Sequence, residues 1–153
     1  MKAKPKQGRV PKSAHPKIKV LFVAGYGPIV RDQTESEKFY VETPGLSFHR
    51  EEGGYLHTDK IEGVKHFALW PLSQAAQSCF GTDAWPKDLP VPHSWLEFDV
   101  DDVESASKEL KRQGYKALVF TRREPWGQIV TRLLSPEGIL VGVTFTPSMR
   151  EGK

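Results

Sequence analysis

The stretch His93–Gly114, HSWLEFDVDDVESASKELKRQG, contains a strand that is followed at once by a helix. Apolar and polar residues alternate over 93–100, which is the period of a half-buried strand. The segment 101–114 opens with acidic residues, carries basic residues near its end and stops at a glycine. The helix dipole and the glycine stop favour that arrangement. We therefore predict a strand over 93–100 and a helix over 101–114.

Three more strands are expected after this helix. The runs 115–121, 127–134 and 139–146 are rich in β-branched and aromatic residues, and Pro136-Glu137-Gly138 supplies the last turn. Residues 93–146 are thus expected to form one module of the order βαβββ.

The first half of the chain repeats this order. A strand is expected over 18–26 and a helix from Asp32 to the Pro44-Gly45 stop, followed by strands at 46–50, 55–58 and 64–70. The connection 71–92 contains a short helical patch at 74–79. Six identities support an internal duplication. Asp32, Glu35, Ser36 and Gly45 match Asp101, Glu104, Ser105 and Gly114 at an offset of 69, and Glu62-Gly63 match Glu137-Gly138 at an offset of 75.

Composition limits the class of protein. A chain of 153 residues with 38% hydrophobic residues suffices for one packed domain, and no apolar run reaches the roughly 18–20 residues that span a bilayer. The single cysteine, Cys79, has no partner for an internal disulfide. Because no apolar leader follows Met1, we expect a cytoplasmic protein without a membrane partner.

The formal net charge of +3 comes from one end of the chain. Residues 1–17 hold six cations and no acid, which leaves 16 cations against 19 anions, a net charge of −3, in residues 18–153. We predict a disordered basic tail over 1–17, a domain over 18–146 made of modules 18–70 and 93–146, and a C-terminal tail over 147–153. Nucleic-acid binding is not expected except through the basic tail.

The sequence resembles the vicinal-oxygen-chelate superfamily, which includes glyoxalase I, extradiol dioxygenases and bleomycin-binding resistance proteins. The resemblance covers about residues 18–146. It rests on the helix that begins at Asp32, on Leu96–Val103, on Pro125-Trp126-Gly127 and on Leu134–Gly138. It implies an α+β fold in which two βαβββ modules form an eight-stranded sheet curled around a cleft, and it implies a homodimer.

Enzymes of this superfamily hold a divalent metal in that cleft, with donors from the first and last strand of each module. Those places fall at Tyr26, Phe67, Trp95 and Gly142 in this sequence. None is His, Glu or Asp, so no metal and no other cofactor is expected there. A one-residue slip on the fourth strand would turn His66 inward, and the run 25–28 is prone to a bulge that would reorient Tyr26.

The candidate ligand-binding residues are the aromatic and polar side chains expected to face the cleft: Tyr26, Phe67, Trp95, Glu97, Trp126 and Arg132. Glu97 shares a strand face with Trp95 and Asp99. It either pairs with Arg123 or Arg132, or acts as a buried carboxylate that binds a ligand cation or serves as a base. Arg132 either grips an acidic ligand group or makes a structural salt bridge. Catalytic residues cannot be named.

The leading hypothesis is a metal-free member of the superfamily that binds or sequesters a small organic ligand in an aromatic-lined cleft, as bleomycin-binding proteins do. On this hypothesis Trp95→Ala should abolish ligand binding and leave the fold largely intact. The alternative is a divalent-metal-dependent glyoxalase-like lyase or dioxygenase with unconventional donors. The candidates for those donors are His66, His93, Glu97 and Glu124.

Overall fold

The fold was examined in a computed structural model, which describes residues 7–10 and 18–151. Most of the predicted basic tail, residues 1–6 and 11–17, lies outside the described residues. Residues 7–10 of that tail are exposed and belong to no helix or strand. No helix in the described ranges is long and apolar enough to cross a lipid bilayer.

The first module contains β1 (Val20–Val30), helix α1 (Gln33–Glu37) and a π-helical turn η1 (Lys38–Glu42). These are followed by β2 (His49–Arg50), a 3₁₀ turn η2 (Glu52–Gly54), β3 (Leu56–Thr58) and β4 (Phe67–Pro71). Helix α2 (Leu72–Phe80) then opens the connection to the second module.

The second module contains β5 (Ser94–Val100), helix α3 (Val103–Arg112), β6 (Val119–Arg123), β7 (Ile129–Leu134) and β8 (Leu140–Phe145). Both modules therefore have the predicted order βαβββ. Residues 147–151, assigned to a C-terminal tail from the sequence, instead form a short helix α4 (Pro147–Glu151).

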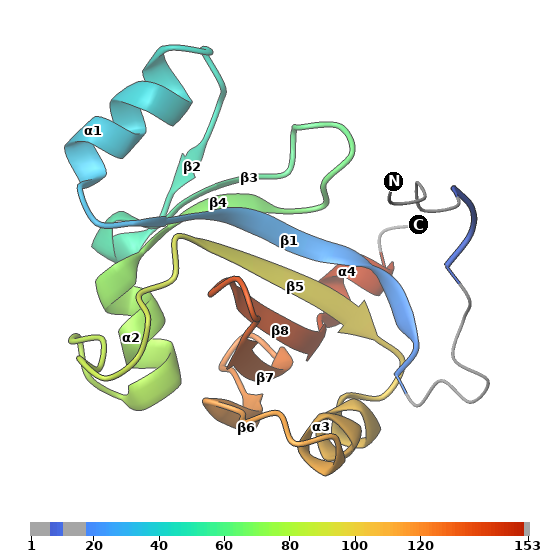
Figure 1. The fold of residues 1–153 in the computed structure, drawn as a ribbon. Coiled ribbons are helices and arrows are strands. Elements are labelled where there is room, and N and C mark those ends of the chain that lie inside the picture. Colours follow the sequence, from blue (N-terminus) through green and yellow to red (C-terminus); the bar gives the residue numbers. More distant parts are fainter. Residues whose placement is uncertain (1–6, 11–17, 152–153) are drawn as a thin grey trace, which may run out of the picture.

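The eight strands form one mixed, open sheet of order β2-β3-β4-β1-β5-β8-β7-β6. The first strands of the two modules, β1 and β5, pair antiparallel at its centre, and each pairs in parallel with the last strand of its own module. Figure 1 shows α1 over the first half of this sheet and α3 over the second half. The predicted α+β fold with two modules is confirmed.

Each module helix begins at an aspartate cap. Asp32 Oδ1 accepts a hydrogen bond from Glu35 N at 3.1 Å, and Asp102 Oδ1 accepts one from Ser105 N at 3.0 Å, which satisfies amides that the helix leaves free. The two caps are 70 residues apart, not 69. In the structure Asp32 therefore corresponds to Asp102, and the internal repeat is shifted by one residue from the sequence identities.

The sheet has two faces with different coverings. The outer face carries η1 on residues such as Leu56 and Leu69, and α3 on Val100 and Val143. The opposite face, here called the inner face, carries α2 together with Trp95 and Leu140. Several apolar residues of β1 remain exposed: Val20, Leu21, Val23 and Tyr26. The homodimer expected from the resemblance stays a prediction.

Candidate functional site

Three side chains of β5 divide the inner face into regions. Trp95, Glu97 and Asp99 share this face because side chains alternate along a strand. Trp95 lies at the end covered by α2. Asp99 lies at the other end, where it accepts hydrogen bonds from Thr146 N at 2.9 Å and from the Arg150 guanidinium of α4. Glu97 occupies the middle.

Glu97 forms a buried ion pair with Arg132 of β7. Arg132 Nη1 donates to Glu97 Oε1 at 2.9 Å, and Arg132 is only 4% exposed. Gly142, which pairs with both residues across the sheet, makes room for this contact: a Cβ there would lie 3.1 Å from Glu97 Cγ. Of the two arginines predicted as partners of Glu97, Arg123 and Arg132, it is Arg132 that forms the pair.

A polar chain extends from this pair to the surface. Gln128 Nε2 donates to Glu97 Oε2 at 3.1 Å and to Thr144 Oγ1 at 2.9 Å. Gln128 Oε1 in turn accepts a hydrogen bond from Trp126 Nε1 at 3.0 Å, although Trp126 is 68% exposed. The structure thus joins the predicted residues Glu97, Arg132 and Trp126 in one network.

One atom of this network has no partner. Arg132 Nε is buried and donates no hydrogen bond to any of the described residues. The guanidinium instead lies over the ring of Trp70, 4.9 Å from its centroid, where the contact is a cation–π interaction. A buried donor left without an acceptor costs about 1–3 kcal/mol.

Trp95 is a core residue in this structure. It is 4% exposed, its indole Nε1 donates to Ala68 O at 3.1 Å, and its ring packs edge-on against Trp70 at 6.0 Å. The ring occupies space left by two glycines of β1. A Cβ at Gly25 would lie 2.6 Å from the Trp95 ring, and one at Gly27 would lie 1.8 Å from Ala68 O.

The prediction that Tyr26 and Phe67 face the same side as Trp95 is wrong. Gly25 and Gly27 face Trp95, so Tyr26 between them faces outward, and it is exposed. Phe67, its partner on β4, packs against Tyr40 and Phe48 under η1. β1 has two register shifts against β5, between Val20 and Phe22 and between Val23 and Gly25, and each of them changes which of the following side chains face Trp95.

The positions that usually hold the superfamily's metal do not fit one here. Trp95 fills its place with an indole, Gly142 has no side chain, and Tyr26 and Phe67 lie on the other face. Glu97, the nearest carboxylate on β5, uses both oxygens to accept hydrogen bonds from Arg132 and Gln128. The donor set at this place is therefore that of an ion pair.

His66, which directly precedes β4, lies on the inner face beside Trp95. Its Nε2 lies 2.6 Å from the Tyr55 hydroxyl, its ring stacks on His57 at 5.1 Å, and it contacts Trp95 at 6.3 Å. Burial lowers the pKa of the His66 imidazole to about 4, so it is neutral at physiological pH. Burial, and next the charge of Glu97, raise the pKa of the Tyr55 hydroxyl.

His93 and Glu124, two other residues suggested as unconventional metal donors, lie away from the His66 cluster with Tyr55 and His57. His93 is exposed, and its backbone carbonyl accepts from Ile29 N at 2.8 Å. Glu124 is buried, and its Oε1 lies 3.3 Å from Arg122 Nε without a well-aligned hydrogen bond. The four residues suggested as unconventional donors therefore do not form one group of ligands.

A different group of side chains lies at the sheet edge and was not among the predicted site residues. His49, Glu51 and His57 have ligand atoms that all lie within 4.8 Å of one another, and they form the one such group of three among the described residues. In the sequence, Gly53-Gly54 indicates a turn between the two strands. In the structure the register of this β2–β3 hairpin places His49 directly opposite His57.

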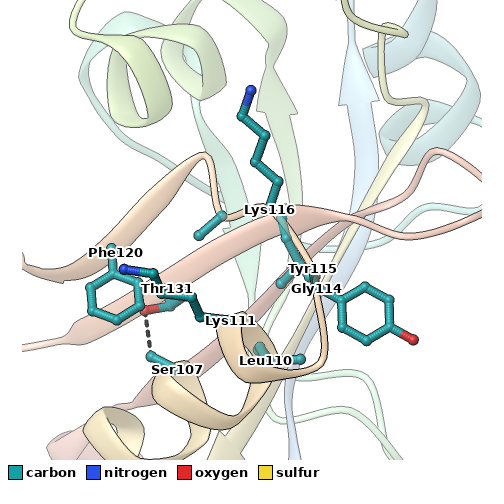
Figure 2. Close-up of a pocket in the computed structure, with 10 residues that line it drawn as sticks. Ser107, Leu110, Lys111, Gly114, Tyr115, Lys116, Phe120 and Thr131 are labelled. Carbon is teal, nitrogen blue, oxygen red and sulfur yellow. Dashed lines mark hydrogen bonds between the residues drawn. The ribbon is translucent and has the colours of Figure 1, made fainter.

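A cavity of about 580 Å³ lies on the outer face, between α3 and strands β6 and β7. Figure 2 shows Lys111, Tyr115 and Phe120 around it, with Ser107 and Thr131 joined by a hydrogen bond of 2.6 Å. None of the predicted ligand-binding residues lines this cavity. It is therefore separate from the Glu97–Arg132 network.

Cys79 of α2 is expected to be unreactive in the folded protein. It is buried, and burial raises the pKa of its thiol to about 11, so about one molecule in a thousand carries a thiolate at pH 8. A disulfide reagent such as DTNB should modify it rapidly only after denaturation in urea. Equal rates in native and denatured protein would contradict this burial.

Comparison with known proteins agrees with this architecture. The family model described as Glyoxalase/Bleomycin resistance protein/Dioxygenase superfamily matches residues 26–143. No curated protein sequence matches the chain.

Three solved structures illustrate the similarity. A glyoxalase/bleomycin resistance protein/dioxygenase superfamily member from Vibrio splendidus 12B01 has 12% identity and a TM-score of 0.53, covering 82% of this chain and 98% of that one. Methylmalonyl-CoA epimerase from Streptomyces coelicolor has 16% identity and a TM-score of 0.51, covering 85% and 97%.

An extradiol ring-cleaving dioxygenase from B. fuscum has 20% identity and a TM-score of 0.58, covering 90% of this chain and 36% of that one. At these identities the similarity to the solved structures shows the fold alone and does not extend to their activities. The family match, however, spans both modules. The chain therefore belongs to the glyoxalase/bleomycin resistance protein/dioxygenase superfamily.

Proposed function

We propose that the protein binds a small organic molecule on the inner face of the sheet, next to the Glu97–Arg132 pair. The observation that carries this proposal is the buried Arg132 Nε, which has no acceptor although its neighbour Nη1 is paired with Glu97. A ligand oxygen, from a carboxylate or a carbonyl, would satisfy this donor and recover the cost of leaving it unpaired.

Aromatic side chains form the rest of the proposed site. Tyr55, His57 and His66 are half-buried and stacked, with ring centroids 5.1–6.1 Å apart. The charge of Glu97 raises the pKa of the Tyr55 hydroxyl and the charge of Arg132 lowers it, so both members of the pair act on this group. This arrangement suits a flat ligand that stacks on the rings and directs an acidic or carbonyl oxygen toward Arg132.

In this proposal the ligand is held without a metal at the superfamily's usual positions. Binding and sequestration need stacking surfaces and a polar anchor, and the rings of Tyr55, His57 and His66 and the Arg132 guanidinium are the groups proposed for these roles. The alternative, a metal-dependent lyase or dioxygenase, needs about three convergent donors that leave a position open for substrate. The engagement of Glu97 by Arg132 and Gln128 favours the binding function.

The test is direct binding by the full chain to defined probes: benzoate, salicylate, catechol and bleomycin. Isothermal titration and quenching of tryptophan fluorescence should detect saturable, one-to-one binding of at least one of the probes that carry an acceptor oxygen on a flat ring. The double variant Glu97→Gln/Arg132→Met removes the charged anchor without leaving a lone buried charge. It should weaken binding of that probe at least tenfold, since a hydrogen bond to a charged group contributes about 1.5–3 kcal/mol.

Arg123→Met is the matched control, because Arg123 is an exposed arginine on the neighbouring strand β6. It should leave the affinity unchanged. Failure of all four probes to bind the wild-type chain, or equal affinity in the wild type and the double variant, would refute the proposed anchor.

A further inference from the structure

The β2–β3 hairpin brings two imidazoles onto one carboxylate oxygen. His49 Nε2 lies 3.3 Å from Glu51 Oε1, and His57 Nε2 lies 3.1 Å from the same oxygen. The two histidine rings also touch edge to face, with centroids 5.2 Å apart. The Nε2 atoms of both histidines thus lie next to the same oxygen of Glu51.

This convergence follows from the register of the hairpin. His49 and His57 are directly opposite each other on antiparallel strands, and Glu51 lies two residues beyond His49, so the period of two puts all three on one face. The tight turn between the strands relies on Gly53 and Gly54, both with positive φ. Glu51 N donates to Tyr55 O at 2.8 Å, which fixes the backbone beside the turn.

Two of the three distances between donor atoms are near those of a tetrahedral metal site, and all three donor atoms lie within 4.8 Å of one another. With Zn–N and Zn–O bonds of about 2.0–2.2 Å, adjacent donor atoms in a tetrahedron lie about 3.3–3.6 Å apart. The two nitrogen–oxygen distances are already close to this value, and the exposed His49 side chain is free to adjust. We propose that His49, Glu51 and His57 bind a borderline transition-metal ion such as Zn²⁺, Ni²⁺ or Co²⁺.

The surroundings support this set of ligands. The His57 ring stacks on the ring of His66, and this contact orients one of the three metal-binding side chains. The nearest cation on β2, Arg50, is neutralised by Glu37 through bonds of 2.8 and 3.0 Å, which reduces its repulsion of a metal ion. Two imidazoles and one carboxylate favour these ions over Mg²⁺ or Ca²⁺, which prefer oxygen ligands.

The proposed site differs in place from the one usual in the superfamily. Its donors come from the second and third strands of the first module, at the sheet edge, and not from the first and last strands. Three protein donors also leave a fourth position for water or a ligand atom. His57 also belongs to the stacked rings of the proposed ligand site, whereas His49 and Glu51 do not, so variants of His49 and Glu51 test the metal site separately from the Glu97–Arg132 anchor.

The experiment uses the full chain without an affinity tag. Isothermal titration with Zn²⁺ should show one equivalent bound, and Co²⁺ should give the visible absorption of a tetrahedral complex. His49→Gln, Glu51→Gln and His57→Gln should each weaken Zn²⁺ binding and bleach the cobalt spectrum. Loss of a direct ligand should cost more than the 10–100-fold that loss of an outer-shell partner typically costs.

His93→Gln and Glu52→Gln are the controls, because both side chains are exposed and neither belongs to the group. They should bind Zn²⁺ as the wild type does. His49 has 70% of its side chain exposed, so His49→Gln keeps the fold and decides the test even if another variant unfolds. Absence of binding, equal binding in His49→Gln, or equal affinity for Mg²⁺ would overturn the proposal.

Discussion

Trp95→Ala is expected to lower the free energy of unfolding by about 3–5 kcal/mol, the cost typical of removing a large buried aromatic side chain. The indole is 4% exposed, donates to Ala68 O and packs on Trp70. Its removal would leave a cavity bounded by Gly25 and Gly27, which have no side chains to fill it. The sequence-based expectation that this variant keeps the fold largely intact therefore changes.

Urea denaturation followed by circular dichroism measures this loss as a lower midpoint. Trp126→Ala is the matched control, since its ring is 68% exposed and makes one hydrogen bond, to Gln128. It should cost no more than about 1 kcal/mol. If the two tryptophan variants lose the same stability, Trp95 is not the packing residue that the structure describes.

The elements of the fold could be predicted because each has a local signal. The alternation in 93–100 predicted which side chains of β5 share a face, and the aspartate and glycine at the ends of 101–114 predicted α3. These signals depend on a few neighbouring residues and on general helix and strand physics. The order of two βαβββ modules followed from them.

Local sequence patterns could not predict which face of the sheet each side chain of β1 occupies. The Gly25-Tyr26-Gly27 segment offers little pattern, and a shift of one residue at a bulge moves every later side chain to the other face. The outcome depends on a contact between distant segments, because Trp95 occupies the space beside both glycines. Tyr26 and Phe67 were therefore assigned to the wrong face, while Trp95, Glu97 and Arg132 were assigned to the right one.

The histidine group at the sheet edge shows the same limit. Each histidine considered alone is an ordinary polar residue of a strand. Their relation becomes visible only when the hairpin register pairs His49 with His57. A one-residue change in that turn would separate them, so sequence spacing alone does not identify the group.

The Glu97–Arg132 pair is expected to show strong coupling between its two members. Either single variant, Glu97→Gln or Arg132→Met, leaves the other charge buried, because both side chains are nearly inaccessible. Removal of one partner of a buried pair typically costs about 3–5 kcal/mol. The double variant leaves neither charge in the protein. The amide oxygen introduced by Glu97→Gln can still accept the hydrogen bond that Gln128 Nε2 donates to Glu97. It should therefore cost about 1–3 kcal/mol less than the two single variants added together.

A double-mutant cycle in urea denaturation measures this coupling directly. The interaction free energy should reach about 1–3 kcal/mol, the upper part of the range for residues in one network. Arg123→Met, on the exposed part of β6, supplies the control and should change stability by no more than about 0.5 kcal/mol. Additive effects of Glu97→Gln and Arg132→Met would mean that the two charges are solvated separately. In that case Arg132 would be no anchor for a ligand, because water could already satisfy its Nε.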